Sequence, residues 1–522
     1  MAVQPGIAIT ARARLFAALE LAFPVSFKPA NEGRGDADAL ITICDEGAFP
    51  SRDDMAGRGL PTLVVGGERD LHAPLGEVLL SECDAVDQRI RGVSVSDTVE
   101  GPGLGPLDRA QEVLASARSG PAWTKSRGSA PVHRVRCALP ELGPDQALRD
   151  LFTEHALTLI ALVQFLRTVT DADSFSSPKL RAVILFDDPN LRWRTYGFID
   201  YRQLLEHADA HGYHASMAMI PLDVWGQHRA TVDLFRKHAD RLSLVLHGNN
   251  HVARELMQPV DDADAIAIAA QAMRRAARFE SRYGLGIDRV MTPPHGMCGA
   301  NIARALGALG FDALCAIHPL PWTERTPAGR PLAGWDPAEF AEGCAVIPRI
   351  PLKTEFSEIA LRAFLGHPLV LYGHHGDLSE GLDLLAATAS RVNRLGEVQW
   401  TSLGEIAATN HSIRLDGGIV RVRPYSHRLR VNVPSGAKSL VVESPRDLNQ
   451  GLAGWSGECS PTVPFDSSMP CEPGKLEIHL KPLCSIDPAN VPSPTPRVWP
   501  ILRRAATEAR DRLRPLLQVG SV

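Results

Sequence analysis

The sequence predicts an α/β protein built around a β/α barrel, with a smaller domain on either side of it. Three observations support this fold class. Strand-like apolar runs alternate with helix-like stretches between residues 181 and 372, and a Gly/Ser/Pro-rich stretch at 116–131 separates them from an earlier α/β segment. After residue 410, apolar and polar residues alternate one by one. Regular β–α alternation is typical of a parallel sheet, whereas period-2 alternation is typical of antiparallel sheets.

Length and composition fit a globular protein of several domains. A chain of 522 residues suggests roughly three domains. Its 44% hydrophobic and 22% charged residues are ordinary for a soluble protein, and the net charge of -5 gives no electrostatic reason to expect nucleic acid as a partner. The nine cysteines contain no Cys-x-x-Cys pair. This pattern argues against a cysteine-based zinc site and favours a reducing compartment.

The N-terminal sequence and the longest apolar stretch bear on location. Glu20 interrupts the apolar N-terminal stretch, and no small-residue cleavage site follows it. The longest apolar stretch, 156–166, contains Gln164 and is too short to cross a bilayer. We therefore expect a cytoplasmic protein without a transmembrane segment.

Residues 1–125 are expected to form a small α/β domain, to which the sequence assigns no role. The runs 39–43 and 60–65 are strand-like, and Gly, Asp or Glu stands within two residues of the end of each. The stretch 116–131 is interpreted as a linker or an exposed loop. Residues 145–168 then have the character of a helix, so the barrel domain is placed at 145–410.

The barrel itself is expected from seven strand-like runs. Helix-like stretches such as 261–283 and 299–310 lie between them. Seven β–α units fit a closed barrel, whereas an open doubly wound sheet has the same periodicity and stays the alternative. The runs occupy residues 181–187, 213–220, 241–247, 287–292, 311–317, 345–350 and 367–372.

The C-terminal part is predicted to hold a β-sandwich at 411–490 and a helix at 496–519. Turn residues recur about every ten residues in the first segment, as in antiparallel sandwiches. The second segment is an Arg-rich amphipathic helix. We expect this helix to dock on its own domain, and peripheral contact with an anionic membrane is the alternative.

Aspartates and histidines stand at the ends of four predicted strands. The runs end in Asp187-Asp188, in His247-Gly-Asn-Asn-His251, in Thr292-Pro-Pro-His295 and in His374-His375. Taken singly, each could be an ordinary turn or a hydrogen-bonded loop residue. Because functional groups gather at the carboxyl ends of parallel strands, the coincidence of four such ends predicts a site there.

These residue types suggest metal-assisted hydrolysis. One carboxylate and two imidazoles make a three-ligand site with an open position for water, which is the arrangement of catalytic rather than structural zinc. A second carboxylate beside the ligating one can deprotonate that water, and a histidine from another strand can protonate a leaving group. The pattern therefore supplies a base, a metal site and an acid.

The four motifs, in this order over roughly residues 181–410, resemble the polysaccharide deacetylase superfamily (the NodB-homology, carbohydrate esterase family 4 group). The resemblance implies a distorted (β/α)7–8 barrel. It implies that Asp187 is the catalytic base and that Asp188, His247 and His251 bind one divalent metal ion, with zinc as the first choice.

The resemblance does not decide which of two adjacent histidines is the catalytic acid. The motifs also depart from the family pattern in three places. His374 best matches the catalytic acid, His375 competes with it, and His295 is the next candidate. Pro189-Asn190 follows the aspartates where the family usually has Gly, and His295 stands where an aromatic residue is usual. The family's base-orienting Arg is missing near the third motif, and Arg349 could replace it.

The resemblance implies a metal-dependent hydrolase of C–N amide bonds that removes acetyl from an N-acetylated amino sugar or polysaccharide. The expected partner is a carbohydrate or another N-acylated small molecule. One alternative is a metal-dependent amidohydrolase that acts on a non-carbohydrate C–N bond. The other is a carbohydrate-binding protein without activity. Because every motif precedes residue 380, the β-sandwich and the C-terminal helix are expected to be dispensable for the chemistry.

Overall fold

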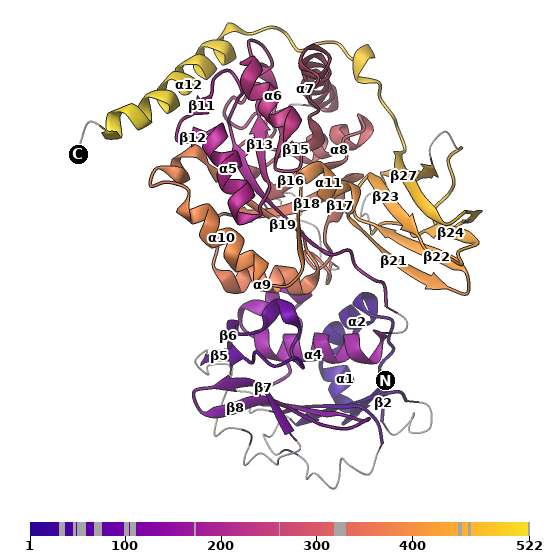
Figure 1. Cartoon of the computed structure of the whole chain (residues 1–522). Coiled ribbons are helices and arrows are strands. Elements are labelled where there is room, and N and C mark those ends of the chain that lie inside the picture. The colour runs from indigo at the N-terminus through magenta and orange to yellow at the C-terminus, as the bar shows by residue number, and fades with distance from the viewer. Residues whose placement is uncertain are drawn as a thin grey trace. The chain divides into compact units, whose positions relative to one another are not determined.

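The computed structural model describes residues 1–30, 37–44, 49, 59–66, 76–98, 104, 111–171, 174–259, 261–317, 330–446, 451–457 and 461–519. The chain forms two compact units (Figure 1). Unit 1 comprises residues 1–175, 326–335 and 356–364, and unit 2 comprises residues 176–325, 336–355 and 365–522.

Unit 1 contains a mixed sheet with the strand order β2-β1-β3-β4-β9-β8-β7-β5-β6. Strands β1–β4 and β9 pair in parallel, and the remaining pairs are antiparallel. The strands are β1 Ala2–Gln4, β2 Lys28–Pro29, β3 Leu40–Cys44, β4 Thr62–Gly66, β5 Gly76–Leu80, β6 Ser94–Asp97, β7 Gln111–Ala117, β8 Gly120–Ser126 and β9 Val132–Val135. Its helices are α1 Ile7–Ala11, α2 Ala13–Ala22, α4 Ala156–Val169 and most of α9 Phe356–Leu365.

Two expectations for this region are wrong. The stretch 116–131 was expected to be a linker or an exposed loop, but its first part completes the β7–β8 hairpin. The consecutive residues Ala122 and Trp123 of β8 are fully buried, so both faces of this strand are covered. Helix α4 lies in unit 1 against strands of this sheet, because apolar residues are buried on nearly all its sides. The barrel therefore starts at β10 (Leu180–Asp187) and not at residue 145.

Unit 2 contains the predicted barrel, which is closed. Its seven parallel strands follow the order β13-β14-β15-β16-β18-β19-β10, and β10 pairs with β13 to complete the ring. This pairing excludes the open sheet. The strands are β10, β13 Ala215–Met219, β14 Leu242–His247, β15 Asp288–Thr292, β16 Ala313–Ile317, β18 Cys344–Pro351 and β19 Leu369–His374. Strand β17 (Glu339–Ala341) pairs antiparallel with β18, and β20 (Val398–Trp400) pairs with β10.

Helices connect the barrel strands, and their ends are specified locally. The side chain of Asp261 accepts a hydrogen bond from the backbone N–H of Asp264 and caps α7, which ends at Gly284 with a φ of +62°. An acidic N-cap and a left-handed glycine are the expected helix boundaries. The helices are α5 Tyr201–His211, α6 Arg229–Lys237, α7 Asp262–Tyr283, α8 Ala300–Ala308, α10 Asp383–Asn393 and α11 Leu403–Ala408.

The predicted β-sandwich follows the barrel. One sheet has the order β21-β22-β24-β26 and the other β23-β27-β25, and inward residues of both, such as Val422, Leu440 and Val431, are buried in one apolar cluster. The strands are β21 His411–Asp416, β22 Ile419–Pro424, β23 Arg428–Val433, β24 Ser439–Val442, β25 Leu452–Gly457, β26 Ser468–Pro470 and β27 Gly474–Pro482. Helix α12 (Val498–Val519) comes last. Among the described residues, no helix combines the length and the apolar character that crossing a bilayer requires.

Candidate metal centre

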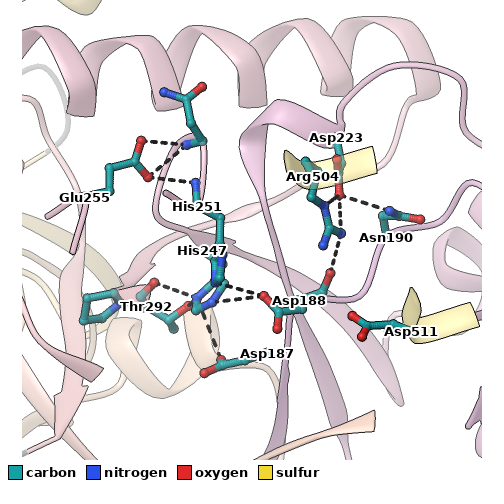
Figure 2. Close-up of polar contacts among 12 residues, drawn as sticks. Asp187, Asp188, Asn190, Asp223, His247, His251, Glu255, Thr292, Arg504 and Asp511 are labelled. Atoms are coloured by element: carbon teal, nitrogen blue, oxygen red, sulfur yellow. Dashed lines mark hydrogen bonds and ion pairs between the residues drawn. The ribbon is translucent and has the colours of Figure 1, made fainter. Parts of the chain in front are cut away.

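Asp188, His247 and His251 converge on one point at the carboxyl end of the barrel. Their ligand atoms lie within 4.8 Å of one another. Oδ1 of Asp188 is 3.0 Å from Nε2 of His251 and 3.6 Å from Nε2 of His247 (Figure 2). Within the described structure, this buried oxygen has no hydrogen-bond partner. Two imidazole nitrogens that approach a carboxylate oxygen without hydrogen-bond geometry fit a shared cation.

His247 is oriented from behind. Its Nδ1 lies 2.9 Å from the carbonyl oxygen of Thr292, which can only accept, so Nδ1 carries the proton and Nε2 keeps a lone pair directed toward Asp188. Burial lowers the pKa of His247 to about 4, so the ring is in the neutral form that a metal ligand needs. The next residue has to be Gly248, because its φ is +60° and a Cβ there would lie 2.7 Å from Pro294.

Glu255 holds the loop that carries the third ligand. Its carboxylate accepts hydrogen bonds from the backbone N–H groups of Asn249 at 3.0 Å and Asn250 at 2.8 Å. It also accepts one from the N–H of His251 at 2.9 Å (Figure 2). His251 has a φ of +56°, which L-residues rarely adopt. Glu255 was not predicted from the sequence, although an acidic residue four positions after the second histidine was the available signal.

Asp187 is held by a buried arginine. Nη1 of Arg349, on β18, donates to both carboxylate oxygens of Asp187 at 2.9 and 3.0 Å, and Nη2 donates to the carbonyl of Pro293. The guanidinium stacks 4.4 Å from the ring centroid of Tyr372. Burial by itself lowers the pKa of Arg349, but the Asp187 carboxylate outweighs this and raises it, so the arginine stays charged. Arg349 is therefore placed to orient Asp187, the role that the sequence suggested for it.

His374 and Asp187 lie side by side on neighbouring strands. They are register partners in the parallel pair β10–β19, and register partners project to the same side of a sheet. His374 is exposed, and it interacts electrostatically with His295. The ring of His295, in the turn η5 (Pro294–Gly296), is 5.8 Å from the ring of His251. Thus His374 and His295 both lie on the solvent side of the three ligands.

His375 is directed elsewhere. It is buried, its Nε2 lies 3.6 Å from Oδ1 of Asp511, and its ring packs against Tyr196 and Phe198 of the β11–β12 hairpin region. Strands β11 and β12 span Thr195–Tyr196 and Ile199–Asp200. The geometry therefore favours His374 over His375 as the acid.

Helix α12 contacts the loops that carry the ligands. Nη2 of Arg504 donates to the carbonyl oxygen of Asp188 at 2.9 Å, and Nη1 of Arg503 donates to the carbonyl oxygen of His251. Nε of Arg504 is 2.7 Å from Oδ2 of the fully buried Asp223 (Figure 2). The helix thus docks on its own domain, as the sequence favoured. These arginines were not predicted from the sequence, where their only signal was the spacing of Arg504, Glu508 and Asp511 along one helix face.

No family model matches the chain, and no curated protein matches its sequence. The chain is similar in structure to Agd3, described as a novel carbohydrate deacetylase, with a TM-score of 0.46 and 10% identity over 93% of this chain and 98% of that one. It is also similar to a family 4 carbohydrate esterase from Streptomyces lividans, with a TM-score of 0.24 and 13% identity over 42% of this chain and 88% of that one. A CE4 esterase from Streptococcus mutans has a TM-score of 0.23 and 13% identity over 43% and 89% of the two chains. Because these TM-scores are below 0.5, what this chain acts on has to follow from its own site residues.

Proposed function

We propose that the chain is a metal-dependent hydrolase that removes acetyl from an N-acetylated amino sugar or polysaccharide. The observation that supports this most is the pairing of Asp187 with Arg349 directly beside the converging Asp188, His247 and His251. A binding protein has no need for a second, arginine-oriented carboxylate next to a metal site. A divalent cation on the three ligands, with zinc as the first choice, would polarise the amide carbonyl and acidify water.

The side chains around these ligands then have separate tasks. Asp187, whose two carboxylate oxygens both accept hydrogen bonds from Nη1 of Arg349, takes the proton of the attacking water. A backbone N–H near His295 helps to stabilise the negative charge that develops on the amide oxygen. His374 gives its proton to the nitrogen as the C–N bond breaks, so that acetate and a free amine leave. Its exposed position allows it to regain a proton from solvent.

A second candidate keeps the metal and replaces the sugar by a non-carbohydrate C–N substrate. Two departures in the motifs favour it: Pro189-Asn190 after the aspartates, and His295 in place of an aromatic residue. The third candidate, a carbohydrate-binding protein without activity, leaves the pairing of Asp187 with Arg349 unexplained.

Metal analysis of the purified full-length protein, followed by an acetate and free-amine assay on N-acetylglucosamine oligomers, tests the proposal. We expect about one equivalent of a divalent metal, activity that a chelator removes, and activity that the metal restores. Bound metal without acetate release would favour the second candidate. A protein that binds no metal from zinc-, cobalt-, nickel- or iron-containing buffer would contradict the proposal.

A further inference from the structure

Helix α12 packs on the barrel with its charged side and not with its apolar side. Arg504, Glu508 and Asp511 are buried, whereas Leu502 and Leu513 are more than half exposed. An amphipathic helix that docks on its own domain ordinarily buries its apolar stripe. The contacts of α12 with the barrel are therefore directional hydrogen bonds and ion pairs, which specify the positions of the groups that they join.

Two of the three candidate metal ligands have strained backbones. Asp188 has a φ of +83° and His251 a φ of +56°, and neither is a glycine. Residues other than glycine persist in this left-handed region only where the surrounding structure fixes them in several ways. The backbone N–H of His251 is held by a hydrogen bond to the carboxylate of Glu255. The N–H of Asp188 donates to the carbonyl of Ala218 at 3.2 Å.

The carbonyl side of both ligands is held by consecutive arginines of α12. Arg504 donates to the carbonyl of Asp188, and Arg503 donates to that of His251. Arg504 is itself fixed by Asp223, a fully buried carboxylate that also accepts a hydrogen bond from Nδ2 of Asn190 at 3.0 Å. One turn of α12 therefore connects the loop after β10 with the loop after β14.

We infer that Arg503 and Arg504 are positioning residues of the metal centre, which makes α12 a part of that centre. This inference rests on the proposed metal-dependent function. It replaces, for α12, the expectation that the C-terminal helix is dispensable for the chemistry. The arginines touch neither substrate nor metal; they hold the backbone from which two ligand side chains project.

The test measures metal affinity by competition with a chromophoric chelator, in the full-length protein without substrate. In Arg503→Ala we expect affinity to fall by about 10–100-fold, the usual effect of losing a group that orients a ligand. Arg503→Lys, which keeps a cationic donor, should restore most of it. Arg504→Lys keeps a charge beside Asp223, removes one donor arm and should also weaken binding. Arg514→Ala, an exposed arginine of the same helix, is the matched control.

The possible outcomes separate the two proposals. If the wild-type protein binds metal and Arg503→Ala and Arg504→Lys bind it within twofold of Arg514→Ala, the positioning role is refuted and the metal site stands. If the wild-type protein binds no metal, both proposals fail. Thermal unfolding of the apoproteins shows whether a loss of affinity comes from a loss of folding. A positioning role requires that a variant binds metal more weakly although its apoprotein unfolds at the same temperature as that of Arg514→Ala.

The outward side of α12 supports an independent second inference. Val498, Trp499, Leu502 and Leu513 are 69, 67, 59 and 53% exposed. At 3.6 residues per turn, Trp499, Leu502 and Leu513 share one face. Exposed Arg510 and Arg514 border it on one side. Over residues 498–515, where the side chains of α12 are described, both acidic residues are buried on the opposite side.

We propose that this outward face, formed by Val498, Trp499, Leu502 and Leu513, binds the surface of an anionic lipid bilayer. Apolar side chains enter the boundary between headgroups and acyl chains, an interfacial tryptophan prefers this depth, and arginines pair with anionic headgroups. A second copy of the same face is a poorer partner, because over residues 498–515 it would bring further exposed arginines and no exposed acidic side chain to pair with them.

Sedimentation with vesicles tests this second inference. The full-length protein should bind vesicles of phosphatidylcholine with phosphatidylglycerol, release them at high salt, and bind pure phosphatidylcholine at least tenfold more weakly. Leu502→Glu should abolish binding. Leu415→Glu, at an exposed leucine of the β-sandwich, is the control and should bind as wild type. Equal binding to both vesicles, or no binding, would overturn the inference. So would a concentration-dependent dimer that Leu502→Glu dissociates, which would assign the face to a second copy.

Discussion

Asp187 and Asp188 are adjacent in sequence and face different surroundings. Asp187 ends strand β10 and points to the guanidinium of Arg349, whereas the left-handed turn at Asp188 directs its carboxylate toward two imidazoles. Two neighbouring carboxylates can therefore act as a base and as a ligand, because their surroundings differ.

Asp187→Asn tests this division of roles. We expect the variant to keep its metal, because none of the three ligands is changed, and to lose about 10²–10⁴-fold in turnover, the usual contribution of a general base. Metal analysis and steady-state kinetics on one acetylated substrate measure the two quantities. Loss of the metal in this variant would show that Asp187 is a ligand and not the base.

The effect of the leaving group on the activity of His374→Ala and His375→Ala distinguishes the two histidines as candidate acids. His374→Ala should slow cleavage of an N-acetyl amine by about 10²–10⁴-fold and spare 4-nitrophenyl acetate, whose leaving group needs no proton. His375→Ala should not show this selectivity, because His375 faces Asp511 and the β11–β12 hairpin. If the selectivity appears only in His375→Ala, then His375 is the acid, and if it appears in neither variant, then His295 is the next residue to change.

At the scale of elements, the loop after β14 is shaped by one side chain. Glu255 accepts the N–H groups of three successive residues, the last of which is the ligand His251. Glu255→Gln removes the charge and one acceptor, so it should lower metal affinity by about tenfold without unfolding the barrel. Chelator competition measures the affinity. Glu397→Gln, which changes an exposed ion pair with Lys179, should leave the affinity unchanged.

The elements that could be predicted are those whose burial leaves a simple pattern of apolar residues in the sequence. The strands of the barrel are buried on both sides, so most of them appear in the sequence as continuous apolar runs, and the predicted and observed bounds nearly coincide. The β7–β8 hairpin was not predicted, because its buried residues are consecutive, without period-2 alternation, and glycine, serine and proline flank them. The side of α12 that packs on the barrel could not be predicted, because the helical period identifies an apolar side but does not say which side is buried.

At the scale of the molecule, the predicted part of the site is the part that stands next to strand ends. Asp187, His247 and His374 are the last residues of their strands, Asp188 comes directly after β10, and His251 lies four residues after the end of β14. Their supporting partners are distant along the chain: Arg349 is 162 residues from Asp187, and Arg504 is 316 residues from Asp188. Such pairs are set by the closure of the barrel and by the docking of α12, and no local pattern in the sequence records them.

Unit 2 should lose stability in mild acid. Burial lowers the pKa of His214 and of His427 to about 4 in the folded state. In the unfolded chain a histidine has a pKa of about 6.5. Between these two values the unfolded state binds more protons, so each histidine removes on the order of 3 kcal/mol of stability as the pH falls from about 6.5 to about 4. Urea unfolding at several pH values measures this slope. His214→Gln should flatten it, whereas exposed His211→Gln should not, and equal slopes in both variants would contradict the assignment.

The contact between Arg504 and Asp188 also has a consequence for the order of folding events. Contacts between residues that are distant along the chain form slowly, because a long loop has to close first. Here the intervening loop contains the rest of the barrel and the whole β-sandwich. If the positioning role of α12 is correct, a chain whose barrel has closed without α12 already has almost all of its secondary structure and still lacks a fixed metal centre. The moment at which a refolding chain first retains metal would then mark the last step of folding, well after its circular dichroism has become native.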